Sequence, residues 1–140
     1  MSLVVDASVA VKWFIQEPLR AQARRLVERH ETLYAPDLLF AEVANAAWKL
    51  ALRNQIDRGQ ALAMIVAVGD PFARVFPSFL LRERALDIAL ALEHPVYDCL
   101  YLACAEAAGA VLVTADARFC EAVAAGPYAG LVRHLSETVA

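Results

Sequence analysis

Two acidic residues occupy positions that suit chemistry at the edge of a sheet. Asp6 follows the apolar run Leu3-Val4-Val5, and Asp116 follows the apolar run at residues 111–115. If both runs are parallel strands, the two carboxylates project from one edge of the sheet, which is where open parallel sheets bind ligands. Each aspartate is also placed to cap the helix that follows, and Ser8 is a competing cap near Asp6.

Asp98 is the most informative acidic residue, because its helical neighbours at positions 101, 102 and 105 are Tyr, Leu and Ala. A carboxylate on an apolar face is costly unless it is paired, hydrogen-bonded or bound to a metal. Asp98 could instead cap its helix. Pro95, however, suits the first helical position, which would make His94 the cap and place Asp98 inside the helix.

Glu42 shares one helical face with Asn45 and Lys49, and alone it indicates no more than a solvated stripe. Together with the three aspartates it completes a set of four carboxylates. Oxygen ligands of this kind suit Mg²⁺, with Mn²⁺ as a substitute. A bound ion would offset the repulsion between the carboxylates, activate a water and stabilise the charge that develops on phosphorus. The set therefore predicts metal-assisted hydrolysis, with one ion or two.

The elements that must position these residues follow from the alternation of short β-branched runs with long Ala- and Leu-rich segments, which predicts an α/β fold with a parallel sheet. Gly69 and Gly109 suit helix ends, and Pro36-Asp37 and Asp57 suit helix starts. The predicted strands are Leu3–Val5, Leu33–Ala35, Arg74–Phe76, Val111–Thr114 and Leu131–Arg133. The predicted helices are Ser8–Phe14, Leu19–His30, Asp37–Arg53, Arg58–Val68, Phe79–Leu92, Val96–Ala108 and Ala117–Ala125. We expect one domain over residues 1–140.

Composition excludes several classes of protein. With 140 residues, 60% of them hydrophobic, the chain can bury a sizeable core and is not disordered. No apolar run approaches the ~18 residues of a membrane span, and no signal peptide is visible, so we expect a cytoplasmic protein. A net charge of −3 gives no global basic field, although 11 of the 13 basic residues are arginines, which leaves phosphate recognition open. Cys99, Cys104 and Cys120 lack C-x-x-C spacing, so we expect reduced thiols.

Four segments of the sequence carry a resemblance to a known family. They are Val4-Val5-Asp6-Ala7-Ser8-Val9-Ala10-Val11-Lys12-Trp13-Phe14, Glu42 within its helix, Tyr97-Asp98-Cys99-Leu100-Tyr101-Leu102-Ala103 and Thr114-Ala115-Asp116-Ala117-Arg118-Phe119. In this order they resemble the PIN domain and, more narrowly, VapC-type ribonuclease toxins of type II toxin–antitoxin systems. The resemblance covers essentially the whole chain.

The resemblance implies a three-layer PIN-like fold with a central parallel sheet of about five strands, and Mg²⁺-dependent endonucleolytic cleavage of RNA. By the same resemblance, the acidic pocket and metal site comprise Asp6, Glu42, Asp98 and Asp116, of which Asp6 and Asp98 are the expected direct metal ligands. Three polar residues would support them: Ser8, Asn45 and Thr114.

The resemblance also implies protein partners, namely a cognate VapB-type antitoxin and a second copy of the chain. The antitoxin tail would lie in an apolar groove and present a basic side chain to the acidic pocket. Trp13, Phe14 and Trp48 are candidates for that groove, with ordinary core packing as the alternative.

Other kinds of site match the sequence less well. A haloacid-dehalogenase phosphatase needs D-x-D, and the second position here is Ser8; a receiver domain needs an early acidic pair. No G-x-S-x-G, P-loop or H-x-E…P-C-x-x-C pattern occurs. His30, His94 and His134 lack metal-type spacing and are predicted to be surface or capping residues. The alternative to an enzyme is a catalytically idle PIN fold that binds protein or RNA, and the presence of all four acids weighs against it.

Overall fold

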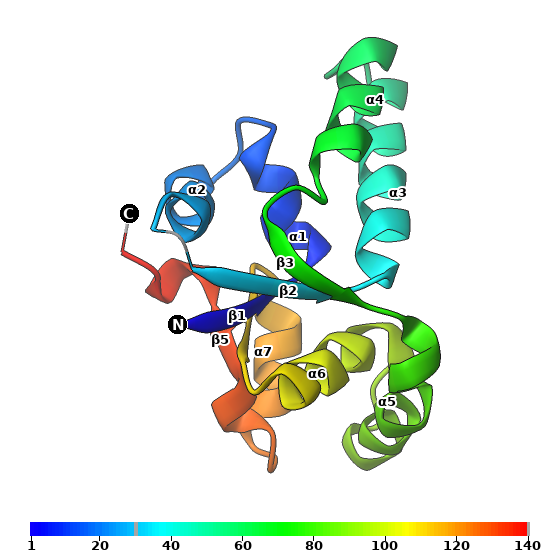
Figure 1. Ribbon diagram of the computed structural model, residues 1–140, viewed down its shortest axis with the longest axis vertical. Coiled ribbons are helices and arrows are strands. Elements are labelled where there is room, and N and C mark those ends of the chain that lie inside the picture. Colours follow the sequence, from blue (N-terminus) through cyan, green and yellow to red (C-terminus); the bar gives the residue numbers. More distant parts are fainter. Residues whose placement is uncertain (30, 140) are drawn as a thin grey trace.

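A single sheet of five parallel strands forms the centre of the molecule (Figure 1). The computed structural model describes residues 1–29 and 31–139. The strands lie in the order β3-β2-β1-β4-β5, with bounds β1 Ser2–Val5, β2 Thr32–Pro36, β3 Phe72–Phe76, β4 Val111–Thr114 and β5 Val132–His134. The predicted α/β fold with a five-stranded parallel sheet is confirmed.

Helices cover both faces of the sheet, which gives three layers (Figure 1). One face carries α1 Ala7–Ala10, the 3-10 turn η1 Val11–Trp13, α2 Arg20–Glu28, α3 Leu38–Leu52 and α4 Arg58–Ala67. The opposite face carries α5 Ser78–Leu92, α6 Val96–Ala108 and α7 Ala117–Ala124. Short 3-10 turns, η2 Ala129–Leu131 and η3 Leu135–Glu137, flank β5. The inner strands β1 and β4 are buried almost throughout, as their unbroken apolar sequences require.

Several predicted boundaries were wrong by a few residues. The helix predicted over Ser8–Phe14 is divided into α1 and η1, and the edge strand β3 begins at Phe72 rather than Arg74. Leu131 belongs to η2, because the turn before β5 is wound as a 3-10 helix. The helix predicted over Leu19–His30 begins at Arg20 and ends at Glu28. His30 lies outside the described residues.

Turn and cap residues explain where several helices begin and end. Asp57 marks the start of α4, as the sequence predicts, and it forms a reciprocal capping box with Gln60. Gly109 ends α6 with a positive φ of 63°, a conformation that glycine adopts without steric cost. The prediction that His134 is a surface or capping residue is confirmed, since its ring accepts a hydrogen bond from the Ser136 amide at the start of η3.

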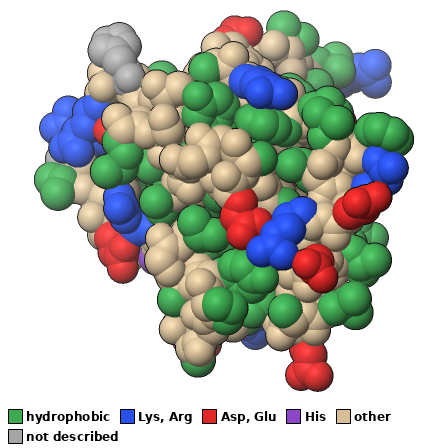
Figure 2. Space-filling view, turned by 60° about the horizontal axis from the view of Figure 1, so that its bottom comes forward, with side chains coloured by type: hydrophobic (Ala, Val, Ile, Leu, Met, Phe, Trp, Pro, Cys, Tyr) green, Lys and Arg blue, Asp and Glu red, His purple; other side chains and the backbone are tan. Residues whose placement is uncertain are grey.

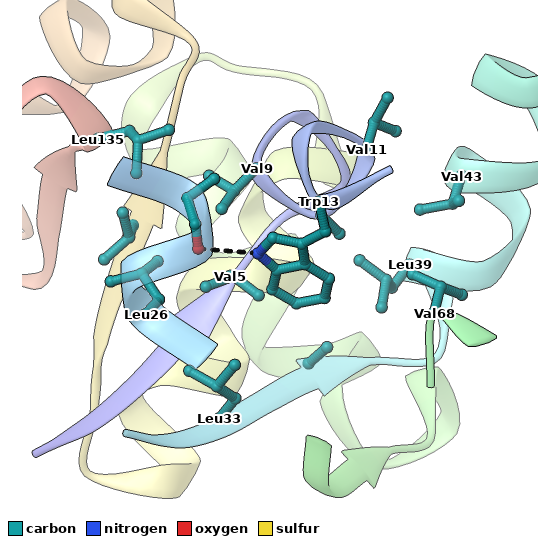
Figure 3. Close-up of a cluster of buried hydrophobic side chains, with 14 of the residues drawn as sticks. Val5, Val9, Val11, Trp13, Leu26, Leu33, Leu39, Val43, Val68 and Leu135 are labelled. Atoms are coloured by element: carbon teal, nitrogen blue, oxygen red, sulfur yellow. Dashed lines mark hydrogen bonds between the residues drawn. The ribbon is translucent and has the colours of Figure 1, made fainter. Parts of the chain in front are cut away.

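Trp13 belongs to the core on the α1–α4 side (Figure 3). Its side chain is 9% exposed, and its indole Nε1 donates a hydrogen bond to the Ala23 carbonyl at 2.9 Å. Trp13 therefore has the core packing that was the alternative to a groove role, because its ring joins η1 to α2, and it also lines a cavity of about 280 Å³ together with Phe14. Phe14 is half-buried, whereas Trp48 on α3 is 57% exposed.

The three cysteines are free, as predicted, with Cys99 and Cys104 buried. Within residues 1–29 and 31–139, no single helix has the length and apolar character to span a membrane; only α5 and α6 taken as one bent pair would meet those two criteria.

Candidate active site

The strand order places two of the predicted acids at the point where the sheet reverses direction. The chain runs outward from β1 through β2 to β3, and then returns to β4 on the other side of β1. Asp6 follows β1 and Asp116 follows β4, so both lie at the carboxyl ends of adjacent strands. This is the position where doubly wound sheets bind ligands.

Asp6 is held by hydrogen bonds on both carboxylate oxygens. Oδ1 accepts the Ser8 hydroxyl at 2.6 Å and the Val9 amide at 3.2 Å, and Oδ2 accepts the Thr114 hydroxyl. Burial raises the pKa of Asp6 to about 6, since these bonds only partly offset the loss of solvation and the charge of Glu42 adds to it. Asp6 is therefore both a helix cap and a poorly solvated carboxylate.

Ser8 and Thr114 join the two strand ends around Asp6. Besides donating to Asp6, the Ser8 hydroxyl accepts the Ala115 amide at 3.0 Å, and the Thr114 hydroxyl accepts the Asp116 amide at 3.1 Å. Asp116 caps α7, with Oδ1 accepting the backbone amides of residues 118 and 119. The side chains of Ser8 and Thr114 thus both contact Asp6, which is what their predicted supporting role requires.

Asp98 lies in the first turn of α6, and its carboxylate is paired with a histidine. The His94 Nε2 and Asp98 Oδ2 atoms are 2.7 Å apart, and the His94 ring packs against Phe119 with ring centroids 4.9 Å apart. The predicted cap was wrong by one residue, because Pro95 takes the N-cap position with an extended ψ of 143°. Asp98 nonetheless lies inside the helix, as predicted.

Glu42 projects from α3 toward α6, where it accepts a hydrogen bond from Tyr101 with the Tyr Oη and Glu Oε1 atoms 2.6 Å apart. Burial raises the pKa of Glu42 and the charge of Asp98 adds to that effect, whereas the bond from Tyr101 opposes it. The Tyr101 side chain is fully buried, and burial also raises the pKa of its hydroxyl, so Tyr101 is a neutral donor.

All four predicted acids line one small cavity of about 140 Å³. Its walls also include Ala7, Tyr101 and one of the three predicted supporting residues, Ser8; the lining residues are Asp6, Ala7, Ser8, Glu42, Asp98, Tyr101 and Asp116. Thr114 is buried behind Asp6, and Asn45 lines a neighbouring groove rather than this cavity. The structure thus gathers residues that are up to 110 positions apart in the sequence, from Asp6 to Asp116.

The donor chemistry of the cavity fits a hard divalent cation, because its carboxylates supply only oxygen atoms. Across the described part of the chain, however, no group of three or more His, Cys, Asp or Glu side chains is arranged to hold a metal ion. Three of the four carboxylates use one oxygen atom for the protein contacts described above; they are those of Glu42, Asp98 and Asp116. The second oxygen of each carboxylate is the one available to an ion, and the side chains must shift to enclose it.

A family model for the PIN domain matches residues 3–124. The chain belongs to the PIN-domain family. This PIN domain is 35% identical over 123 residues to ribonuclease VapC3 of Pyrobaculum aerophilum, an alignment that covers 86% of the chain and 94% of that protein. It is 34% identical over 120 residues to ribonuclease VapC12 of Mycobacterium tuberculosis, covering 85% and 90%. The predicted VapC-type PIN domain is confirmed.

Solved structures agree with this assignment. PAE2754 from Pyrobaculum aerophilum superposes with a TM-score of 0.72 at 26% identity, covering 98% of this PIN domain and 85% of that chain. A chain of VapBC2 from Rickettsia felis superposes with a TM-score of 0.67 at 13% identity, covering 96% and 98%, which shows a shared fold. The PIN-like three-layer fold is therefore confirmed.

Two residues that contact the acids were not predicted as site residues from the sequence. In the sequence, Tyr101 stands out only as part of the apolar surroundings of Asp98, although a buried tyrosine needs a partner for its hydroxyl. His94 was expected to cap a helix, although it stands four residues before Asp98, a spacing at which side chains meet on one helix face. Both signals are visible in the sequence, but neither identifies the partner atom.

Proposed function

We propose that this PIN domain is an Mg²⁺-dependent endoribonuclease and the toxin of a toxin–antitoxin pair. One observation carries the proposal: the four carboxylates, which come from four separate elements, line one cavity at the switch point of the sheet. The ribonuclease names of the relatives support RNA as the substrate. The alternative is the idle binding module, which needs no such concentration of acids.

Asp6, Glu42, Asp98 and Asp116 are the proposed holders of the metal, with Mn²⁺ as a possible substitute. When bound, the ion supplies an activated water and stabilises the charge developing on phosphorus. Ser8 and Thr114 keep the Asp6 carboxylate at the strand end, and Tyr101 keeps Glu42 turned toward α6. Neighbouring carboxylates repel one another here, since the charge of Glu42 raises the pKa of Asp6 and the charge of Asp98 raises the pKa of Glu42, and this repulsion supports a metal requirement.

RNA cleavage by the purified protein in Mg²⁺ and in EDTA tests this proposal. We expect cleavage in Mg²⁺ only, and a loss of about a hundredfold or more in Asp6→Asn and Asp98→Asn. The matched control is Asp70→Asn, an exposed aspartate outside the cavity, which should cleave at the parental rate. A parent that binds RNA in Mg²⁺ without cleaving it would be the idle module, and a folded Asp98→Asn variant of parental activity would remove Asp98 from the metal site.

The proposed protein partners are a VapB-type antitoxin and a second copy of the chain, in the cytoplasm. The VapBC2 complex among the structural neighbours supports the antitoxin. The exposed apolar side chains of α5 support a homodimer; they are Phe79, Leu80, Leu86 and Leu90. Sedimentation of the parent and of Leu90→Glu tests the dimer: the parent should sediment as a dimer and the variant as a monomer, and a monomeric parent would refute it.

A further inference from the structure

A groove of about 620 Å³ opens beside the acidic cavity. Three residues, Ala7, Ser8 and Glu42, line both spaces, so the groove leads directly to the carboxylates. One wall is formed by α1 and η1, and the other by the face of α3 that carries Glu42, Asn45 and Lys49. Within the described residues, neither Trp13 nor Trp48 lines it.

The sequence contains only two lysines, and both lie in this groove. Lys12 comes from η1 on one wall, and Lys49 comes from α3 on the other. None of the arginines, all of which are described, lines the groove. On the face shown in Figure 2, Lys and Arg side chains are scattered rather than gathered into one patch. The positive charge next to the cavity therefore comes from the lysine pair, and an ammonium group is a compact charge well suited to phosphate.

The two lysines lie at different distances from the acids. Lys12 is four residues beyond Ser8, about 6 Å along its wall, and Lys49 is seven residues beyond Glu42, about 10 Å along α3. They would consequently contact different phosphates of one strand. Tyr97, whose side chain is 61% exposed, lines the groove and offers a ring on which a base can stack.

We propose that this groove holds the single-stranded RNA on one side of the cleaved phosphate, with Lys12 and Lys49 contacting successive phosphates and Tyr97 stacking on a base. This inference rests on the proposed ribonuclease function. A polyanion that enters a cavity of carboxylates is repelled by them, so neutralising groups beside the entrance are needed in addition to the metal. The exposed aromatic ring favours a nucleic acid over an acidic peptide as the occupant.

Replacing Glu17 should change the RNA affinity in the direction opposite to replacing either lysine. Its Oε1 lies 3.3 Å from the Lys12 ammonium, and the Lys12 side chain is only 12% exposed, so the ion pair holds the ammonium inside the groove. Glu17 also lines the groove and competes with phosphate for Lys12. Removing the charge of Glu17 should therefore tighten RNA binding, whereas removing the charge of either lysine should weaken it.

Fluorescence anisotropy with a short labelled 2′-O-methyl RNA measures these effects. Ca²⁺ replaces Mg²⁺ to suppress cleavage, and gel analysis verifies that the probe stays intact. Lys12→Gln and Lys49→Gln should each weaken binding about fivefold at low salt. Each should also reduce the slope of log K against log salt concentration by about 0.7. Glu17→Gln should bind more tightly, and Tyr97→Ala should lose affinity without a change in slope. Arg58→Gln, the same charge change on the exposed start of α4, should leave the slope unchanged.

Cleavage kinetics separate this inference from the proposed function. With the lysine variants, KM should rise at low salt while kcat at saturating RNA stays near the parental value, because neither lysine lines the acidic cavity. The decisive case is a parent that cleaves RNA and a double variant, Lys12→Gln with Lys49→Gln, whose salt slope equals that of the parent. This result overturns the proposed RNA groove and leaves the proposed function standing. A parent that does not cleave RNA refutes the function itself. If the lysine variants lose binding to an acidic peptide while their RNA binding is unchanged, the groove belongs to a protein segment and the proposal is also overturned.

Discussion

Replacing Asp6 by asparagine removes a charge from a carboxyl group that is only 9% exposed. Its pKa rises from an ordinary 3.8 to about 6 on folding, because burial disfavours the ionised form. At neutral pH this difference corresponds to about 3 kcal/mol of lost stability. The free energy of unfolding should therefore fall as the pH rises from about 4 to about 6, since the folded state binds more protons than the unfolded state over that range.

The asparagine also loses a hydrogen bond, which offsets part of the gain. Its carbonyl can accept from Ser8 and Val9 as Oδ1 does, but its amide group would face the Thr114 hydroxyl, which now donates to Oδ2. A hydrogen bond of this kind contributes about 1 kcal/mol. The net expectation above about pH 7 is a variant more stable than the parent by about 2 kcal/mol, or roughly 6 °C in Tm.

Urea unfolding in EDTA across the pH range measures this prediction. The advantage of Asp6→Asn should shrink as the pH falls, disappear near about pH 4.5, and reverse below it, as Asp6 becomes protonated in both the folded and the unfolded state. The exposed Asp70→Asn variant serves as the control, and its stability should follow that of the parent. A variant less stable than the parent by the same amount at every pH would show that Asp6 acts only as a cap, and would refute the argument from its buried charge.

The remaining predictions concern other contacts of the site and the fold. Tyr101→Phe should cost about 1.5–3 kcal/mol in urea unfolding, because it removes the donor to the partly buried Glu42 carboxylate. Asp98→Asn should melt in EDTA at or above the parental Tm and lose most of the Mg²⁺-induced rise; a marked fall in EDTA with an intact rise would make Asp98 a structural residue. Asp57→Ala should lower stability by about 1 kcal/mol through loss of the capping box, with RNA cleavage unchanged, and altered cleavage would contradict the separation of α4 from the site.

The parts of the fold that the sequence predicts well are those where local signals agree. The apolar runs of β1 and β4 are continuous because both faces of these strands are covered, and Gly109 marks the end of α6 by its conformational freedom. The edge strands were placed less accurately. Two consecutive exposed residues in β3, Ala73 and Arg74, interrupt its apolar pattern, and Leu131 is apolar in a 3-10 turn where a strand is predicted.

The site was predictable as a set of residue types but not as a set of contacts. Asp6 and Asp116 could be placed at one edge of the sheet because parallel strands end together. The partners of the other two acids could not be found in this way. The contact of Glu42 with Tyr101 joins residues 59 positions apart, and depends on how α3 and α6 sit on opposite sides of the sheet edge. No local pattern encodes such a contact.

The helix-capping role of Asp6 and Asp116 has a consequence for how the family can diverge. Both carboxylates accept main-chain amides of the helices they begin, so the backbone fixes where their oxygens lie. Main-chain geometry tolerates many side-chain replacements in the surrounding core. A descendant or a designed protein could therefore replace most of its packing residues and keep these carboxylate oxygens in the same place. The condition is that it retains a strand, a tight turn and a helix start at each of the two positions.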